Sequence, residues 1–366
     1  MKVSAIGEFA LIERIRNILP KPHDALFGIG DDCAALRPTP GRDLLLTTDL
    51  LVDGIDFTRQ TTTPFRLGRK AMGVNLSDIA AMGGLPRAAL VTLAIPAEEE
   101  IEFVDELYRG LQEEGARFAV EVIGGDLSAS TALMISVTLV GEVETGRAVT
   151  RSGARPGERI WTTGRLGAAA AGLTALRAGC RLRDDQVGIP FEVSDSLRET
   201  FRQTIERHLC PIPRIMEGRA LAQAGAASAM IDLSDGLASD LAHLCRESGV
   251  SATIREDQVP IDHAASAVAQ RFGHEPLALA LQGGEDFELL FTSSWDPADI
   301  AAILPDTITI TAIGKIEEAG SGCRLERLDG SAVALTGGYD HFRGTERPAI
   351  STQPSATNVI RRATSY

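Results

Sequence analysis

The sequence predicts an α/β protein in which helices are layered on sheets and the chain forms two domains. First, apolar runs typical of buried strands alternate with amphipathic helical patterns along the chain. Second, 366 residues exceed what one hydrophobic core usually organises. Third, a turn-rich polar stretch at 151–158 separates two such series. We therefore expect domains at 1–148 and 149–342, and a disordered polar tail at 343–366.

The first half alternates strands with helices. Apolar residues recurring every three or four positions, ended by proline or glycine, predict helices at 8–19, 65–82 and 97–118. Apolar and β-branched runs predict strands at 44–52, 88–95, 118–123 and 132–143. We expect the polar triplet Thr47-Thr48-Asp49 at the end of its strand, and Gly124-Gly125-Asp126 in the turn after its own.

The second half repeats the alternation. Strands are predicted at 159–162, 227–231 and 308–314, and helices at 164–179, 214–224 and 237–245. The charged segment 181–208 is expected to be peripheral, and 281–291 reads as a turn between apolar segments.

Composition excludes several classes of function. The net charge of −14 argues against nucleic acid or an anionic membrane surface as a partner. The five cysteines are scattered and never spaced Cys-x-x-Cys, which suits reduced thiols better than disulfides or a zinc site. The start lacks an apolar signal core, and no apolar run approaches membrane-spanning length. We expect a cytoplasmic protein.

Acidic segments recur after short apolar runs. The most pronounced, Gly28–Leu36, places Asp31 beside Asp32 in a glycine-framed loop. Adjacent carboxylates repel each other, and a bound cation relieves that repulsion. Four later segments repeat the theme: Thr47–Asp49, Gly124–Asp126, Ile231–Gly236 and Gly283–Asp286. We predict that the five segments converge on a cluster of divalent metal ions that holds a nucleotide triphosphate.

The chain has no phosphate-binding P-loop, no dinucleotide fingerprint and no kinase His-Arg-Asp segment. An acidic protein that binds phosphates must obtain positive charge elsewhere, and Mg²⁺ supplies it. Individual residues leave alternatives open. Arg151 is either a phosphate contact or a linker arginine, Asp78 either a ligand or a solvated helix acid, and Thr47–Asp49 either ligands or a strand-forming pair beside a turn. Tyr108 fits a core position better than a ligand contact.

An ordered set of motifs carries a family resemblance over residues 7–342. In order, they are GEF, GIGDDCA, TTDLLVDG, KAMGVNLSDIAAMG, IGGD, TRSGARPGE, IDLSDGLASDL, GGEDFEL and GYDHF. The set resembles the thiamine-monophosphate kinase family, which is related to aminoimidazole-ribonucleotide synthetase and selenophosphate synthetase. The resemblance implies a two-domain PurM-like architecture whose N-terminal domain pairs across a homodimer. It also implies ATP and several Mg²⁺ ions in the cleft, and it leaves a monovalent-cation requirement open.

The resemblance also assigns roles by matching position. The implied metal ligands are Asp32, Thr47, Thr48, Asp49, Asp78, Asp126 and Asp232, with Asp235 on a further ion. The implied ATP contacts are Tyr108, Gly125, Asp126, Arg151 and Ser234. Glu285 would meet the thiamine moiety. At the same end, Asp56 replaces a histidine common in the family, and Thr336-Gly337 stands where an aromatic often precedes the closing motif.

The implied activity is ATP-dependent phosphorylation of thiamine monophosphate to thiamine diphosphate. A phosphate monoester is already ionised near neutral pH, so no general base is needed and direct in-line transfer rests on alignment and charge neutralisation. One alternative is a relative with another acceptor, although residues 1–27 lack the cysteine that selenophosphate synthetase would favour. The other is a non-enzymatic Ca²⁺-binding protein, although the loops lack EF-hand spacing.

Overall fold

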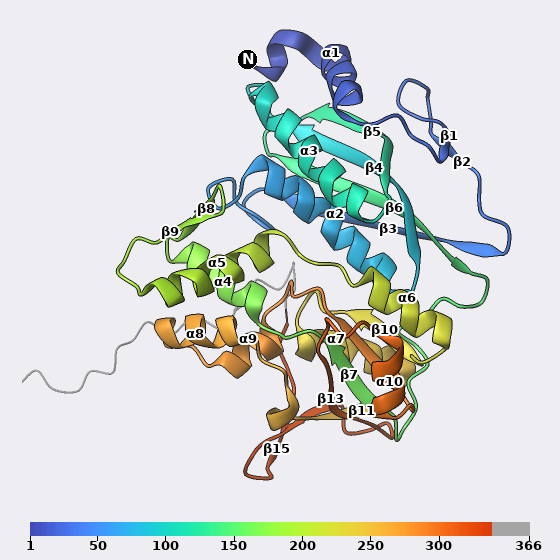
Figure 1. Ribbon diagram of the computed structural model, residues 1–366, viewed down its shortest axis with the longest axis vertical. Helices are drawn as coiled ribbons and strands as arrows, with labels where there is room; N and C mark the ends of the chain where they lie inside the picture. Colours follow the sequence, from blue (N-terminus) through green and yellow to red (C-terminus); the bar gives the residue numbers. More distant parts are fainter. Residues whose placement is uncertain (339–366) are drawn as a thin grey trace, which may run out of the picture.

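The computed structural model describes residues 1–338 and contains two α/β units joined by a packed interface (Figure 1). The last four residues of the closing motif and the predicted tail at 343–366 lie outside the described residues. Layered helices and sheets confirm the predicted fold class. No helix within residues 1–338 combines the length and apolarity needed to cross a membrane.

The first unit is built on a four-stranded sheet in the order β3-β6-β4-β5. Its strands are β3 (Arg42–Val52), β4 (Leu85–Ile95), β5 (Glu121–Ala129) and β6 (Met134–Glu144). Only β4 and β5 run parallel, and α3 (Ile101–Arg117) provides the crossover between them. Helix α2 (Pro64–Ala81) packs beside α3 on one face of the sheet. Preceding these are α1 (Val3–Ile18) and the short pair β1 (Ala25–Phe27) and β2 (Ala35–Leu36).

The second unit contains a seven-stranded sheet in the order β10-β12-β7-β13-β11-β14-β15. Its strands are β7 (Arg159–Thr163), β10 (Ala229–Asp232), β11 (Ser251–Arg255), β12 (Leu289–Ser293), β13 (Ile310–Glu317), β14 (Cys323–Glu326) and β15 (Ala332–Ala334). Close to this sheet are α6 (Ile215–Ala224), α7 (Leu237–Ser248), the 3₁₀ turn Glu256–Gln258 and α10 (Pro297–Ile303).

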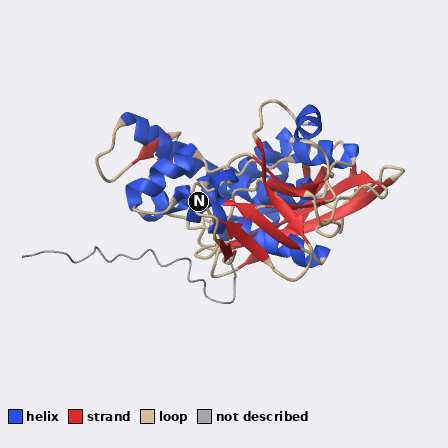
Figure 2. Cartoon of the chain, turned by 90° about the horizontal axis from the view of Figure 1, so that it is seen from below, coloured by secondary structure: helices blue, strands red, loops and turns tan. Residues whose placement is uncertain are grey.

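A helical group lies to one side of the two sheets (Figures 1 and 2). It comprises α4 (Ala168–Arg177), α5 (Asp195–Leu209), α8 (His263–Phe272) and α9 (Pro276–Gln282), with the hairpin β8 (Arg181–Arg183) and β9 (Gln186–Gly188). The fully buried Phe201 of α5 packs edge-on against Phe191 and Phe272. The segment 181–208 thus lies to one side of the sheets, as expected, but its apolar side chains form a core of their own, which was not predicted.

Helix α2 lies between the two units (Figure 1). It begins at Thr63, whose hydroxyl accepts the N–H of Arg66, and Pro64 occupies the first turn. It is buried nearly all round, as expected of a helix enclosed by other elements. One hydrophobic cluster continues from α2 to Met230 and Phe291 of the second unit. This interface lets side chains of α2 reach loops of both units.

One predicted strand position and one predicted strand end were wrong. Thr47–Asp49 lies in the middle of β3, where it pairs with Val137–Leu139 of β6. The strand predicted to stop at residue 123 continues through Gly124-Gly125-Asp126 to Ala129, because β4 supplies a complete hydrogen-bonding partner. Both polar triplets are therefore held by rigid sheet rather than by turns.

Candidate active site

Three carboxylates from three elements meet at α2. Asp49 lies on β3, Asp78 on α2, and Asp232 at the end of β10. The Thr47 hydroxyl donates a hydrogen bond to Asp78, and the Ser77 hydroxyl donates to Oδ2 of Asp232 at 2.7 Å. Thr47 and Asp49 share one face of β3 because side chains alternate along a strand. The structure thus gathers acids separated by about 180 positions in the sequence.

These carboxylates affect one another electrostatically. Burial, reinforced by repulsion from Asp78, raises the pKa of Asp49 to about 7. Burial also raises the pKa of Asp232 to about 7, again with repulsion from Asp78. Burial raises the pKa of Asp78, against the opposing effects of the Thr47 hydroxyl and Arg151. A group of buried acids that destabilise one another's charged forms is a favourable environment for a cation.

The carboxylate oxygens at this site fit the way in which proteins usually bind Mg²⁺. Within residues 1–338, no three or more His, Cys, Asp or Glu side chains are arranged to hold a metal ion by themselves. Mg²⁺ normally keeps several waters and is bound by one or two carboxylates together with substrate phosphates. Asp49, Asp78 and Asp232 can supply those carboxylates, and a bound triphosphate would supply the remaining oxygens.

The loop after β10 is fixed by Asp240, a residue the sequence analysis missed. Its carboxylate accepts the backbone N–H groups of Asp235 at 3.1 Å and Gly236 at 3.0 Å. Burial raises the pKa of Asp240 to about 8, with repulsion from Asp232 and Asp235. The signal for it was the Asp-Gly-x-x-x-Asp spacing at the start of α7, which is typical of a carboxylate folding back on a helix start.

The GGED loop lies directly against this segment. The N–H of Glu285 donates to the carbonyl of Ser234 at 2.8 Å, and that of Phe287 donates to Leu233 at 2.9 Å. A Cβ added at Gly284 would lie 2.4 Å from the Ser234 carbonyl oxygen, so only glycine permits this approach. Glu285 itself has a φ of 69°. The predicted substrate loop and the predicted metal-binding loop are therefore joined by their backbones.

Two basic side chains hold the Glu285 carboxylate. Lys70 Nζ lies 2.7 Å from Oε1, and His208 Nδ1 lies 2.9 Å from Oε2. Although burial raises the pKa of Glu285, Lys70 and His208 outweigh it and hold that pKa well below its usual range. Lys70 and Ser77 are seven residues apart on α2, two helical turns, so one face of this helix reaches both loops.

The sequence analysis missed both of these basic residues. Lys70 was visible only as the first residue of the KAMGVNLSDIAAMG motif, and His208 lies in the segment expected to be peripheral. No local pattern indicates that either would contact Glu285.

Asp32 and Asp126 lie apart from the three grouped acids. Both are exposed, Asp32 in the loop after β1 and Asp126 on β5. The loop rests on β5, because a Cβ added at Gly28 would lie 2.5 Å from the carbonyl oxygen of Ile123. Since β5 is separated from β3 by two strands, Asp126 lies about 14 Å from Asp49 across the sheet. Their role as ligands of shared ions stays a prediction.

Three further residues with a predicted metal or ATP contact are Thr48, Gly125 and Tyr108. Thr48 faces the opposite side of β3 from Asp49, with its hydroxyl 3.2 Å from Ser136. Gly125 has a φ of 156°, and a Cβ there would lie 1.9 Å from the Val91 carbonyl oxygen, so glycine is required. Tyr108 is only 3% exposed and belongs to the hydrophobic core. The ligand role predicted for Thr48 and the ATP contacts predicted for Gly125 and Tyr108 stay predictions.

The remaining predicted residues are Arg151, Asp56 and Thr336. Arg151 is exposed, and its charge lowers the pKa of both Asp78 and Asp232, which places it beside the acids. Asp56 accepts the N–H of Val52 at 2.9 Å within its own turn. Thr336 is exposed, and its carbonyl accepts Nε2 of Gln282, the residue before the GGED loop, at 3.4 Å.

Comparison with known proteins identifies the family. Residues 30–143 match the AIR synthase related protein N-terminal domain, and residues 155–323 match the C-terminal domain. Thiamine-monophosphate kinase of Aquifex aeolicus is 36% identical over 345 residues, which cover 93% of this chain and all of that protein. The chain belongs to the thiamine-monophosphate kinase family. The predicted family and PurM-like fold are thereby confirmed, while the predicted boundary at 148/149 falls between the two matches and stays a prediction.

Solved members of the family have the same fold. The crystal structure of thiamine-monophosphate kinase from Stenotrophomonas maltophilia K279a is 35% identical, with a TM-score of 0.75, and the match covers 90% of this chain and 98% of that one. A structure described as AaThiL complexed with AMPPCP and TMP is 34% identical, with a TM-score of 0.71, and covers 93% and 99%. These relatives span the cleft-forming elements of both units described above.

Proposed function

We propose that this chain transfers the γ-phosphoryl group of ATP to thiamine monophosphate, giving thiamine diphosphate. The observation that carries this function is the match over 93% of the chain to a relative complexed with AMPPCP, an ATP analogue, and TMP. The cleft supports it, because a group of three acids and a charge-compensated glutamate lie along one face of α2. This arrangement supports a proposed site for charged phosphates beside a proposed site for an organic substrate.

The acids would hold Mg²⁺ in this cleft. Asp49, Asp78 and Asp232 are the main proposed ligands, and further ions would involve Asp235, Asp32 and Asp126. When bound, Mg²⁺ neutralises negative charge on the phosphates of donor and acceptor. The fit rests on the mutual repulsion of buried carboxylates described above.

The chain's own residues act by positioning. The Thr47 hydroxyl orients the Asp78 carboxylate, and the Ser77 hydroxyl orients Asp232. Arg151, exposed beside the acids, is placed to contact a phosphate oxygen. The acceptor oxygen is already ionised, so no side chain has to remove a proton, and transfer is direct and in line without a phosphoenzyme.

The open face of the first sheet supports a homodimer. Leu44, Leu46 and Leu50 are 50%, 70% and 54% exposed on one face of β3. Leu90 of β4 lies on the same face, because its partner on β6 also pairs with Thr48. An exposed apolar patch on a sheet whose other face is covered is typical of a subunit interface. We assign this face to pairing between two copies of the chain.

The thiols support the proposed cytoplasmic setting. All five cysteines are free, and Cys180, Cys210 and Cys245 are buried. Burial raises the pKa of Cys180 to about 11, which keeps it as an unreactive thiol. Cysteines used in this way suit a reducing compartment.

The test is an acceptor survey with the purified full-length chain. ADP formation is measured with ATP and Mg²⁺ in the presence of thiamine monophosphate, thiamine, aminoimidazole-ribonucleotide precursors or selenide, and the product is identified by mass spectrometry. We expect turnover with thiamine monophosphate and a product heavier by one phosphate. Turnover with another acceptor only would assign the chain a different reaction, and Ca²⁺ binding by calorimetry without any ATP affinity would favour a non-enzymatic role.

A further inference from the structure

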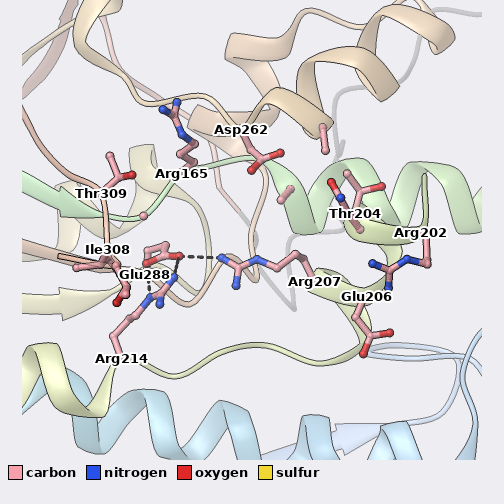
Figure 3. Close-up of a pocket in the computed structure, with 15 residues that line it drawn as sticks. Arg165, Arg202, Thr204, Glu206, Arg207, Arg214, Asp262, Glu288, Ile308 and Thr309 are labelled. Carbon is pink, nitrogen blue, oxygen red and sulfur yellow. Dashed lines mark hydrogen bonds and ion pairs between the residues drawn. The ribbon is translucent and has the colours of Figure 1, made fainter. Parts of the chain in front are cut away.

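A separate cavity of about 410 Å³ lies in the second unit. Its wall combines the end of β7, the start of α4, the last turns of α5 and the segment entering β13 (Figure 3). None of the residues predicted to bind metal, ATP or thiamine monophosphate lines it. The volume falls within the range of small-molecule sites. Four arginines contribute to the wall: Arg165, Arg202, Arg207 and Arg214.

A fully buried carboxylate organises the base of the cavity. Glu288 is 0% exposed and accepts hydrogen bonds from Arg207 Nη2 at 2.8 Å and Arg214 Nε at 2.6 Å. The Thr163 hydroxyl donates to it at 2.8 Å. A Cβ at Gly164 would lie 2.2 Å from this carboxylate, so glycine makes room for it. Figure 3 shows both guanidinium groups directed at Glu288.

The acidic side chains of the wall are already engaged. Besides Glu288, Asp262 accepts the N–H of Ala265 at 3.0 Å as the cap of α8. Glu206 pairs with Arg66 on α2, with Oε2 3.4 Å from Nε. Each of the three carboxylates in the cavity wall therefore already has a hydrogen-bond or ion-pair partner within the protein.

Two arginines of the wall, in contrast, retain guanidinium N–H groups that are available to a ligand. Arg207 uses only Nη2 in its contact with Glu288. Arg165 donates Nη1 to the carbonyl of Ile261 at 3.4 Å, and it is not within 4.0 Å of any carboxylate among residues 1–338. Both side chains are half-buried, so their remaining N–H groups face restricted solvent. A planar guanidinium with free N–H groups matches the oxygens of a phosphate.

We propose that this cavity is a second ligand site, which binds a small anion bearing a phosphate group through Arg165 and Arg207. Glu288 holds Arg207 in place for that contact, and Arg214 in turn holds Glu288. The neighbour of Arg207 on α5, His208, contacts Glu285 of the substrate loop, so the new site adjoins the cleft without sharing its residues.

The probe is inorganic pyrophosphate, titrated calorimetrically into the full-length chain in the presence of EDTA. Without divalent metal, the acidic cleft repels phosphates, so binding under this condition reports the arginine-lined cavity. We expect one pyrophosphate per chain, with affinity that falls as salt is raised. Because no ATP, metal or turnover is involved, the result is independent of the kinase assignment.

Variants locate the site. Arg165→Gln and Arg207→Gln should each weaken pyrophosphate binding about tenfold or more, the usual effect of losing a charge-assisted hydrogen bond. Arg202→Gln is the matched control, because Arg202 also lines the wall but has its Nε and Nη2 bound to Glu199 at 2.8 Å. It should change affinity by less than about twofold. Should Arg207→Gln unfold on loss of its Glu288 contact, as thermal unfolding will show, Arg165→Gln alone decides.

Four results would overturn the proposal. The first is that pyrophosphate produces no binding heat. The second is that Arg202→Gln weakens binding as much as Arg165→Gln, which would indicate only a diffuse charge effect. The third is that only Arg151→Gln abolishes binding, which would show that pyrophosphate binds beside the acids and not in this cavity. Tighter binding of malonate than of pyrophosphate would show that the cavity selects carboxylates and not phosphates.

Discussion

Replacement of Lys70 by methionine tests whether α2 positions the substrate loop. Lys70 is 2% exposed, and its Nζ is 2.7 Å from Glu285. At an effective dielectric constant of about 20, the attraction at this distance is about 6 kcal/mol, much of it offset by desolvation of the lysine. Removing one partner of a buried pair costs about 3–5 kcal/mol. Glu285 keeps His208 and is 28% exposed, so we expect a loss of about 3 kcal/mol in the free energy of unfolding.

The assay separates positioning from stability. Urea unfolding gives the free energy, and ADP formation at varied substrate concentrations gives KM and kcat. Without Lys70, the pKa of Glu285 moves up toward its usual value and its carboxylate is less fixed. We expect the KM for thiamine monophosphate to rise about tenfold or more and the KM for ATP to change by less than about twofold. Lys315→Met, at an exposed lysine on β13, is the control and should leave both unchanged.

A double-mutant cycle with Glu285→Gln completes the test. If Lys70 acts through Glu285, the two substitutions should be strongly non-additive in the KM for thiamine monophosphate. Additive effects would refute the positioning role. A loss of stability with both KM values at the wild-type level would also refute it, because Lys70 would then only stabilise the contact between the two units.

Three further predictions address the acids and the sheet face. Asp49→Asn should lower turnover about 100-fold or more. The melting temperature without ligand should stay near wild type, because burial and repulsion from Asp78 disfavour the ionised form of this carboxylate in the wild-type protein. Lost stability with retained turnover would contradict this. Leu46→Glu should convert a dimer to a monomer in light scattering, whereas Leu328→Glu, exposed outside that sheet, should not. Asp240 holds its proton in the fold up to a pKa of about 8, far above its usual 3.8. The unfolded chain releases that proton from about pH 4, so this group lowers wild-type stability as pH rises to 8, at most about 1.4 kcal/mol per pH unit, and Asp240→Asn should flatten the slope in urea unfolding.

Local patterns predicted most of the fold. Helical periodicity and proline punctuation placed α2, and its observed bounds differ from the prediction by one residue at each end. The end of β5 was less well predicted, because its continuation beyond residue 123 depends on a partner elsewhere in the chain. The hydrophobic pattern of a segment indicates that it forms a β-strand. Where the strand ends depends on how far the neighbouring strand continues beside it.

The sequence by itself determined which residue types were available: acidic segments after apolar runs, a motif order that identifies the family, and the absence of a P-loop lysine. Tertiary structure decided how they group. It brought Asp49, Asp78 and Asp232 together across α2, left Asp32 and Asp126 on the β5 side, and joined Lys70 and His208 to Glu285. The cause is that a sequence motif reflects local backbone requirements. The distance between two charges is instead set by packing between elements, which no local pattern encodes.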